Sequence, residues 1–313
     1  MFVLDKFDKI LLQELDKDSS IPLHALATKL KRSKQFVSYR LQGLEKEGVI
    51  LGYHSIIDVL SLGYFPFRVL LDFVHMTEKE KGHFIEKMKV YPQVVHIDFI
   101  HEQWDCALYI LTKDVEEFRT VWDSILLSYR PHLKREKISL FAPVYIFNKS
   151  FVKEAERKVA VFGRRKKTSK YEELLFHYAS HVREPLLALA KKTKMSPITA
   201  KKVLLDLKKT EIILRNRLFL NPEALGKQYY LLMLSFTHIR TIDSFISHCT
   251  QVPQIYQVNR VLGGEDIELF LMVENRKELL QIIDQLKEKY KEEIRDDDFF
   301  SFSPGYSKGI LPT

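Results

Sequence analysis

The chain repeats itself, and this repeat constrains the fold more than any other feature of its 313 residues. A shift of 163 positions superimposes residues 26–73 on the C-terminal half, and a shift of 161 positions continues the match over residues 84–145. Under the first shift, Ser33 falls on Ser196, followed in both halves by the same apolar spacing. The sequence therefore predicts two copies, in tandem, of one unit of roughly 150 residues.

Each copy begins with three predicted helices and a short β-ribbon. In copy one, apolar residues recur at helical spacing over residues 5–17, 22–30 and 33–47. Gly48 is placed to end the third helix in a left-handed conformation, and residues 49–59 favour a β-ribbon belonging to the same domain. Three helices with a short turn between the second and third, followed by such a wing, predict a winged helix-turn-helix domain.

The remainder of each copy follows the order strand, helix, strand, strand, helix, strand. In copy one, alternating apolar residues from Phe65 to Phe73 indicate a strand that is covered on one face. The order βαββαβ is ferredoxin-like, so the expected class is α+β. The predicted domains are a winged helix-turn-helix at 1–60, a regulatory βαββαβ domain at 61–148, a basic linker at 149–169, a degenerate winged helix-turn-helix at 170–222 and a second regulatory βαββαβ domain at 223–313.

Composition and charge narrow the class of protein. Hydrophobic residues make up 46% of the chain, which argues against disorder, and no apolar run is long enough for a membrane span. Two cysteines are too few for a disulfide framework, and the acidic start does not resemble a signal peptide, so we expect a cytoplasmic protein. The net charge is +7 over residues 149–170 and +5 over residues 171–222, which suggests either a polyanionic partner or a solvated linker.

The third helix of copy one carries the polar residues expected in a DNA major groove. With Val37, Leu41 and Leu44 facing inward, its outward face would present glutamine, tyrosine and serine side chains that can contact base edges or phosphates. The basic turn before it suits phosphate contacts, and the alternative, a merely solvated face, is less favoured. The candidate DNA-binding residues in this region are Lys31, Arg32, Ser33, Lys34, Gln35, Ser38, Tyr39, Arg40 and Gln42.

The segments "LDKFDKILLQEL" and "LATKLKRSKQFVSYRLQGLEKEGVILGY" resemble the Lrp/AsnC, or feast/famine, family of regulators. The resemblance covers both copies and implies a non-enzymatic transcriptional regulator that binds double-stranded DNA, associates through its regulatory domains and senses a small molecule such as an amino acid. Arg40 occupies the position of the family's recognition-helix arginine, where it can contact DNA or brace the domain.

"LGGED" resembles the family's Gly-x-x-Asp effector turn, which would assign Gly263 and Asp266 to an effector site. Copy one keeps Asp105 but has Glu102 in place of the glycine. The alternative for this turn is a plain hairpin.

Copy two departs from copy one on its third helix. Its outward face would hold Ile198 and Leu205, which cannot hydrogen-bond to bases, beside the cationic Lys201 and Lys202. This face predicts either a weaker, sequence-tolerant DNA contact or a protein-docking surface. The basic linker adds four consecutive candidate phosphate contacts, Arg164, Arg165, Lys166 and Lys167.

An enzymatic alternative comes from a second resemblance. Siroheme decarboxylases look like the same two-domain unit, and "VVHIDFIHEQWDCALYI", with His96 and His101, is similar to their histidine-rich stretch. The match slips by one residue, and the wing "ILGYHS" lacks the expected arginines. His177 and His181 have the spacing of two metal ligands without an evident third. We therefore expect neither a metal site nor a cofactor.

Overall fold

The computed structural model describes residues 4–147, 160–161 and 171–307. It confirms the α+β class, with a helix-turn-helix followed by a βαββαβ domain in each copy. The first winged module contains α1 (Lys6–Lys17), α2 (Leu23–Lys29) and α3 (Lys34–Lys46). The second winged module contains α6 (Glu172–Ser180), α7 (Leu186–Lys192) and α8 (Pro197–Lys209).

Local sequence explains where these helices begin. Asp5 and Asp8 form a reciprocal capping box at the start of α1, which satisfies amides that have no partner within the helix. The hydroxyl of Ser33 accepts a hydrogen bond from a first-turn amide of α3, and Ser196 does the same for α8. Gly48 has a φ of +66°, the left-handed conformation predicted for the residue after α3.

The β-ribbon is shared by the two copies, and this corrects the expectation that each copy folds its own wing. β1 (Ile50–Ile57) pairs antiparallel with β7 (Ile213–Leu220) from copy two. The hydroxyl of Ser55 donates to Oδ1 of Asn216 at 2.6 Å in the buried interior of the ribbon. A strand too short to be stable alone thus finds its partner in the other copy rather than in a local hairpin.

The shared ribbon also exchanges core residues between the winged modules. Leu218 and Leu220 of copy two are buried in the core of the first winged module, against the helices of copy one. In return, Ile57 of copy one is buried in the core of the second winged module. Neither core is complete without residues from the other copy, so the two winged modules form one packed unit.

The two βαββαβ domains join into one closed antiparallel sheet, called here the closed sheet. Its strands follow the order β2-β4-β3-β11-β8-β10-β9-β5, and pairing of β5 with β2 closes the ring. β5 and β11 each begin beside a strand of their own copy and end beside a strand of the other. The two βαββαβ domains therefore associate within one chain. The ring strands are β2 (Phe65–Phe73), β3 (Val94–Ile100), β4 (Cys106–Thr112), β5 (Leu133–Ile146), β8 (Gln228–Phe236), β9 (Ile255–Leu262), β10 (Ile267–Val273) and β11 (Ile294–Ser307).

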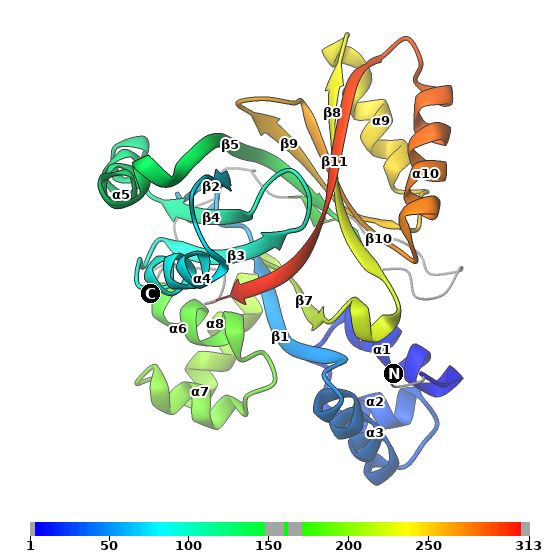
Figure 1. Ribbon diagram of the computed structural model, residues 1–313. Coiled ribbons are helices and arrows are strands. Elements are labelled where there is room, and N and C mark those ends of the chain that lie inside the picture. The colour runs from blue at the N-terminus through cyan, green and yellow to red at the C-terminus, as the bar shows by residue number, and fades with distance from the viewer. Residues whose placement is uncertain (1–3, 148–159, 162–170, 308–313) are drawn as a thin grey trace.

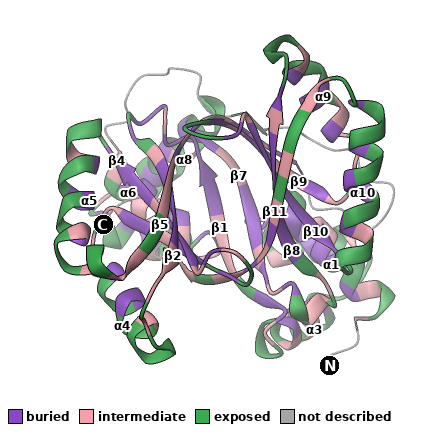
Figure 2. Ribbon diagram, turned by 45° about the horizontal axis from the view of Figure 1, so that its top comes forward, coloured by how far each residue is buried: buried purple, intermediate pink, exposed green. Residues whose placement is uncertain are grey.

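Four helices cover the outside of the closed sheet. α4 (Glu78–Met88) and α5 (Val115–Tyr129) lie on the copy-one half, and α9 (Ile242–Cys249) and α10 (Arg276–Lys289) lie on the copy-two half (Figure 1). Figure 2 shows these helices exposed on their outward faces and the strands beneath them largely buried. β6 (Ala160–Val161) pairs with the end of β5. No helix of the described residues is long and apolar enough to cross a membrane.

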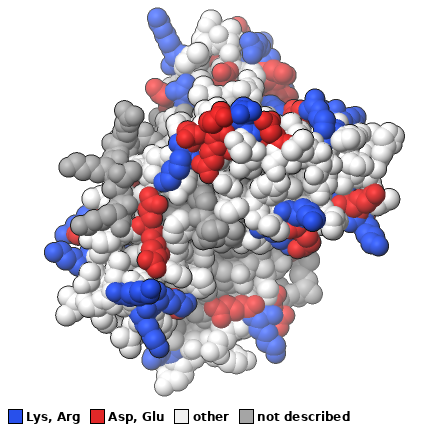
Figure 3. All heavy atoms as spheres, turned by 90° about the vertical axis from the view of Figure 1, so that its left-hand side faces the viewer, with Lys and Arg blue, Asp and Glu red and all other residues white. Residues whose placement is uncertain are grey.

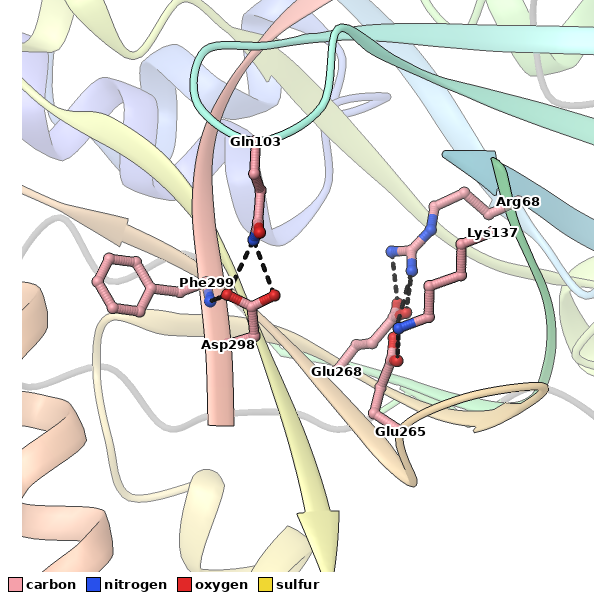
Figure 4. Close-up of polar contacts among 7 residues, drawn as sticks. All are labelled: Arg68, Gln103, Lys137, Glu265, Glu268, Asp298 and Phe299. Atoms are coloured by element: carbon pink, nitrogen blue, oxygen red, sulfur yellow. Dashed lines mark hydrogen bonds and ion pairs between the residues drawn. The ribbon is translucent and has the colours of Figure 1, made fainter. Parts of the chain in front are cut away.

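The inside of the closed sheet holds charged groups as well as apolar side chains. Arg68 on β2 donates from both terminal nitrogens to Glu268 on β10, at 2.8 Å for Nη1, and both side chains are fully buried (Figure 4). Lys137 on β5 pairs with Glu265, which precedes β10. Burial lowers the pKa of Arg68, but the neighbouring Glu268, Tyr109 and Glu265 together outweigh this effect and leave the pKa raised. These contacts tie copy one to copy two.

The central ion pair breaks the symmetry of the repeat. The sequence alignment of the copies places Arg68 opposite Leu231 and Glu268 opposite Ala107. Two copies of the first half would place Arg68 opposite Ala107, and two copies of the second half would place Leu231 opposite Glu268. Neither combination forms the ion pair. The buried charges favour pairing of copy one with copy two over pairing of like copies.

Candidate functional site

The third helix of the first winged module presents a polar face to solvent. Val37, Leu41 and Leu44 are buried against α1 and α2, as their spacing predicts. Tyr39 is 73% exposed at the centre of the opposite face. The other exposed residues of that face are Lys34, Gln35, Gln42 and Lys46, with Ser38 half-buried beside them and Lys31, Arg32 and Ser33 exposed at the preceding turn.

Arg40 points away from this polar face. Its Nε donates to Oδ1 of Asp8 at 3.0 Å, its Nη2 donates to Oδ2 of Asp8 at 2.6 Å, and it also pairs with Asp5. Hydrogen bonding to Asp8, offset in part by burial, raises the pKa of Arg40. Of the two roles considered for Arg40, the structure shows the bracing one, because its guanidinium holds α3 against the start of α1.

The corresponding face of α8 in the second winged module is apolar at its centre. Ile198 is 84% exposed and Leu205 is 49% exposed, at the positions of Gln35 and Gln42 in α3. Lys201 and Lys202 are exposed between them, in accordance with the sequence. On the inward side of α8, Val203 is buried, whereas Leu204, the counterpart of the buried Leu41, is only half-buried.

The predicted effector turns hold their aspartates in structural hydrogen bonds. Asp266 accepts from the Phe236 amide at 2.7 Å, and Asp105 accepts from the Phe73 amide at 2.6 Å and from Nζ of Lys81 at 2.7 Å. Gly263 has a φ of +100°, and a Cβ there would lie 2.8 Å from the Ile138 carbonyl oxygen. In the structure described, the turn fits tightly against β5.

The remaining sequence candidates are the basic linker residues and the histidines. Arg164, Arg165, Lys166 and Lys167 fall outside the described residues. His101 hydrogen-bonds the Ser303 hydroxyl at 2.8 Å on the surface. Within the described ranges, no three histidine, cysteine or acidic side chains gather as a metal site would require. On the face that carries α5, the basic and acidic side chains of the described residues are interspersed (Figure 3).

A cavity that sequence reasoning did not find lies between the shared ribbon and the closed sheet. Its volume is about 560 Å³, and both copies contribute to its walls. Tyr53, His54 and Phe219 reach it from the ribbon, while Phe141 and Tyr256 reach it from the sheet. Aliphatic and aromatic side chains make up most of the lining, which is the usual character of a small-molecule site.

One polar cluster and one ion pair interrupt the apolar walls. His96 hydrogen-bonds Asp98 through Nε2 at 2.8 Å, and its ring lies 5.3 Å from the ring of Tyr109. Burial opposes the protonated form of His96, but the charge of Asp98 and its hydrogen bond to the imidazole together outweigh burial and raise the pKa of His96. Arg217 lines the opposite side and pairs with Asp16 of α1 at 3.2 Å. The cavity thus balances its charges internally.

Comparison with known proteins shows that the N-terminal half is similar to a DNA-binding family and to transcriptional regulators. A model of the winged helix-turn-helix DNA-binding family matches residues 4–50. The HTH-type transcriptional regulator LrpC of Bacillus subtilis is 32% identical over 123 residues, covering 39% of this chain and 81% of LrpC. The transcriptional regulator AzlB of Bacillus subtilis is 29% identical over 126 residues, covering 40% of this chain and 80% of AzlB. Regulator FL11 of Pyrococcus furiosus is 24% identical over 123 residues, covering 39% of this chain and 80% of FL11.

Among solved structures, a whole-chain likeness is to an enzyme. The siroheme decarboxylase NirDL superimposes with a TM-score of 0.63 and 13% identity, covering 98% of this chain and 94% of NirDL. Its structure in complex with an iron-uroporphyrin III analogue gives a TM-score of 0.62 with 14% identity. Identity this low shows the fold alone, namely the full-length arrangement of two units in tandem.

Proposed function

Because the chain belongs, through its N-terminal half, to the Lrp/AsnC family of winged helix-turn-helix proteins, we propose that it is a sequence-specific, DNA-binding transcriptional regulator. The first winged module reads base edges through α3, which enters the major groove of double-stranded DNA. One observation carries the proposal: the exposed face of α3 is made of Gln35, Tyr39 and Gln42, with cationic residues at the turn before it.

The chemistry of this face suits base reading. Glutamine can hydrogen-bond an adenine edge through two atoms, and a tyrosine hydroxyl can reach a base or a phosphate. The braced Arg40 supports the role indirectly, because it fixes α3 against α1 from the side opposite the polar face. A helix held rigidly from behind positions its reading side chains precisely.

The repeat supplies a matched test. Bound duplexes are first selected from a random pool, and affinities for the selected and a scrambled duplex are then measured by fluorescence anisotropy at fixed salt. Gln35→Ala and Gln42→Ala should each reduce the preference for the selected duplex about 5- to 150-fold, the range expected when one base-reading side chain is removed. Ile198→Ala and Leu205→Ala, at the equivalent positions of α8, should leave that preference unchanged. An undiminished preference in folded Gln35→Ala and Gln42→Ala proteins contradicts the proposal.

A second candidate is a decarboxylase acting on a tetrapyrrole, favoured by the whole-chain fold likeness and by the presence of a cavity that His96 lines. The lining fits such a polycarboxylate poorly. Among the described lining residues Arg217 is the sole lysine or arginine, and Asp16 already neutralises it. Titration with siroheme, followed by its visible absorption band and by CO₂ release, separates the candidates: we expect neither a band shift nor release, and both together would favour the enzyme.

A further inference from the structure

The central cavity is unused by the DNA-binding role and has the properties of a ligand site. We propose that it binds one small, uncharged, largely aromatic or aliphatic molecule carrying a single polar group, and that its occupancy alters DNA binding by α3. The second half of this proposal rests on the proposed function, whereas the first half stands independently. The site differs in position and chemistry from the turns that contain Asp105 and Asp266. The carboxylates of these two residues accept hydrogen bonds from backbone amides.

The lining determines the chemical class of the ligand. Aliphatic side chains and the rings of Phe67, Phe141 and Phe270 line the cavity. A ligand that buries apolar surface there gains about 25 cal/mol for each Å² removed from water. The charged groups are already paired, Asp98 with His96 and Arg217 with Asp16. A charged ligand would leave its own charge unpaired in an apolar space or would have to break one of these pairs, and either is costly.

His96 offers the ligand a polar contact in the cavity wall. His96 is about one-quarter exposed and uses Nε2 for Asp98, which leaves Nδ1 to hydrogen-bond a ligand hydroxyl or carbonyl. Tyr109 lies beside this imidazole, with its pKa raised well above the ordinary value by burial and by the Asp98 carboxylate. Tyr109 therefore stays neutral at physiological pH and adds no charge to the wall.

Tyr53 connects the cavity to the DNA-reading helix. Its ring lines the cavity, and its hydroxyl donates to Glu45 near the C-terminal end of α3. Arg183 of the second winged module lies over the same ring at 5.2 Å and donates to the Ser19 carbonyl of the first module at 2.9 Å. A ligand that shifts Tyr53 thus acts on α3 and on the contact between the modules together.

The shared ribbon provides a second mechanical link. β1 and β7 form one wall of the cavity, and β7 also supplies Leu218 and Leu220 to the core of the first module. A packed core moves between discrete arrangements rather than deforming continuously. A ligand that displaces the ribbon therefore also displaces the helices of the first winged module, which pack against it. Coupling of this kind is reciprocal: bound DNA must change ligand affinity by the factor by which ligand changes DNA affinity.

The binding half is tested with the neutral fluorescent probe N-phenyl-1-naphthylamine, whose emission rises in apolar surroundings. The full-length protein should bind it saturably. Val144→Trp, which fills the cavity, should weaken binding at least tenfold, as should Leu51→Trp at the half-exposed edge, a variant less prone to misfolding. Val115→Trp, on the exposed surface of α5, is the matched control and should bind like the parent.

Two results would overturn the binding half: equal probe affinity in the parent and in both filled variants, or displacement of the probe by uroporphyrin, a polycarboxylate, at concentrations where neutral aromatic competitors fail.

The coupling half is tested by repeating the titration with saturating selected duplex, which should change probe affinity at least fivefold. Tyr53→Phe keeps the ring in the wall but removes the Glu45 hydrogen bond, so it should bind probe normally and show a reduced change.

An unchanged probe affinity with and without DNA in the parent would refute coupling. Failure of the proposed function has a different signature, since the parent would then select no duplex while its probe binding stayed measurable.

Discussion

The two copies share a backbone design but present opposite surfaces on their third helices. Lys31 and Lys194, at equivalent turns, both have a φ of +52°, and a serine caps the helix that follows each. After the helix, the left-handed position is Gly48 in copy one and Glu211 in copy two, with φ values of +66° and +55°. The backbone therefore keeps the same left-handed turn after the third helix even though copy two has a glutamate where copy one has a glycine.

The difference lies in what each surface can recognise. α3 exposes hydrogen-bonding side chains, whereas α8 exposes Ile198 and Leu205 at the matching positions. Copy two nevertheless remains essential, because its ribbon strand completes the core of the first winged module and its sheet closes on that of copy one. One copy keeps the polar surface while the other contributes structure, and the following experiments test this division.

The largest effect is expected at the asymmetric ion pair. Glu268→Ala leaves the buried Arg68 with only its longer contact to Glu265, at 3.5 Å, and should lower the free energy of unfolding by about 3–5 kcal/mol, measured by urea denaturation. The double variant Arg68→Leu, Glu268→Ala gives each copy the residue of the other and should recover most of this stability. Equal destabilisation of the single and double variants would show that the pair does not specify the pairing of unlike copies.

Removing the core residue that copy two lends to copy one should have a similar or slightly smaller effect. Leu220→Ala should cost about 2–5 kcal/mol, because Leu220 is fully buried among helices of the first winged module. Leu205→Ala, which truncates the same residue type on the half-exposed face of α8, should change stability by less than about 0.5 kcal/mol. If Leu220→Ala lowered stability without any effect on DNA binding at physiological temperature, the modules would be less interdependent than the structure implies.

Arg40→Ala should separate bracing from reading. The change leaves the buried Asp8 without its guanidinium partner, so we expect a decrease of about 1–3 kcal/mol in unfolding free energy. The sequence preference of the folded variant should match that of the parent. Lys46→Ala, exposed at the other end of α3, is the stability control. A relaxed preference at one base position in Arg40→Ala would instead assign this arginine to DNA contact.

The smallest effects are expected in the salt dependence. Each phosphate that a cationic side chain neutralises adds roughly 0.9 to the slope of log affinity against log salt. Replacing residues 164–167 with alanine should flatten the slope by about that amount for each phosphate no longer neutralised, and should leave sequence preference intact. Lys201→Gln with Lys202→Gln applies the same measurement to α8. An unchanged slope in the linker variant would make the segment a tether, and an unchanged slope in the α8 variant would favour a docking surface for copy two.

Local signals were sufficient for the elements and for the candidate reading face. The 3.6-residue spacing of Val37, Leu41 and Leu44 determined which side of α3 is buried, and hence that Tyr39 is exposed. Serine caps and alternating apolar strands likewise specify helix starts and sheet faces from neighbouring residues alone. The repeat itself, read at two fixed shifts, determined that the chain contains two such units in tandem.

Only the tertiary structure decided how the copies meet. β1 was expected in a local wing, but it pairs with a strand about 160 residues away, because the partner is chosen by burial in the assembled core rather than by adjacent sequence. Arg68 and Glu268 are 200 residues apart, and neither position signals the other. The cavity has no sequence signature either, since it is the space left where two separately specified surfaces, ribbon and closed sheet, do not fully interdigitate. Periodicity fixes which face of an element is buried, and packing between distant elements decides what that face meets.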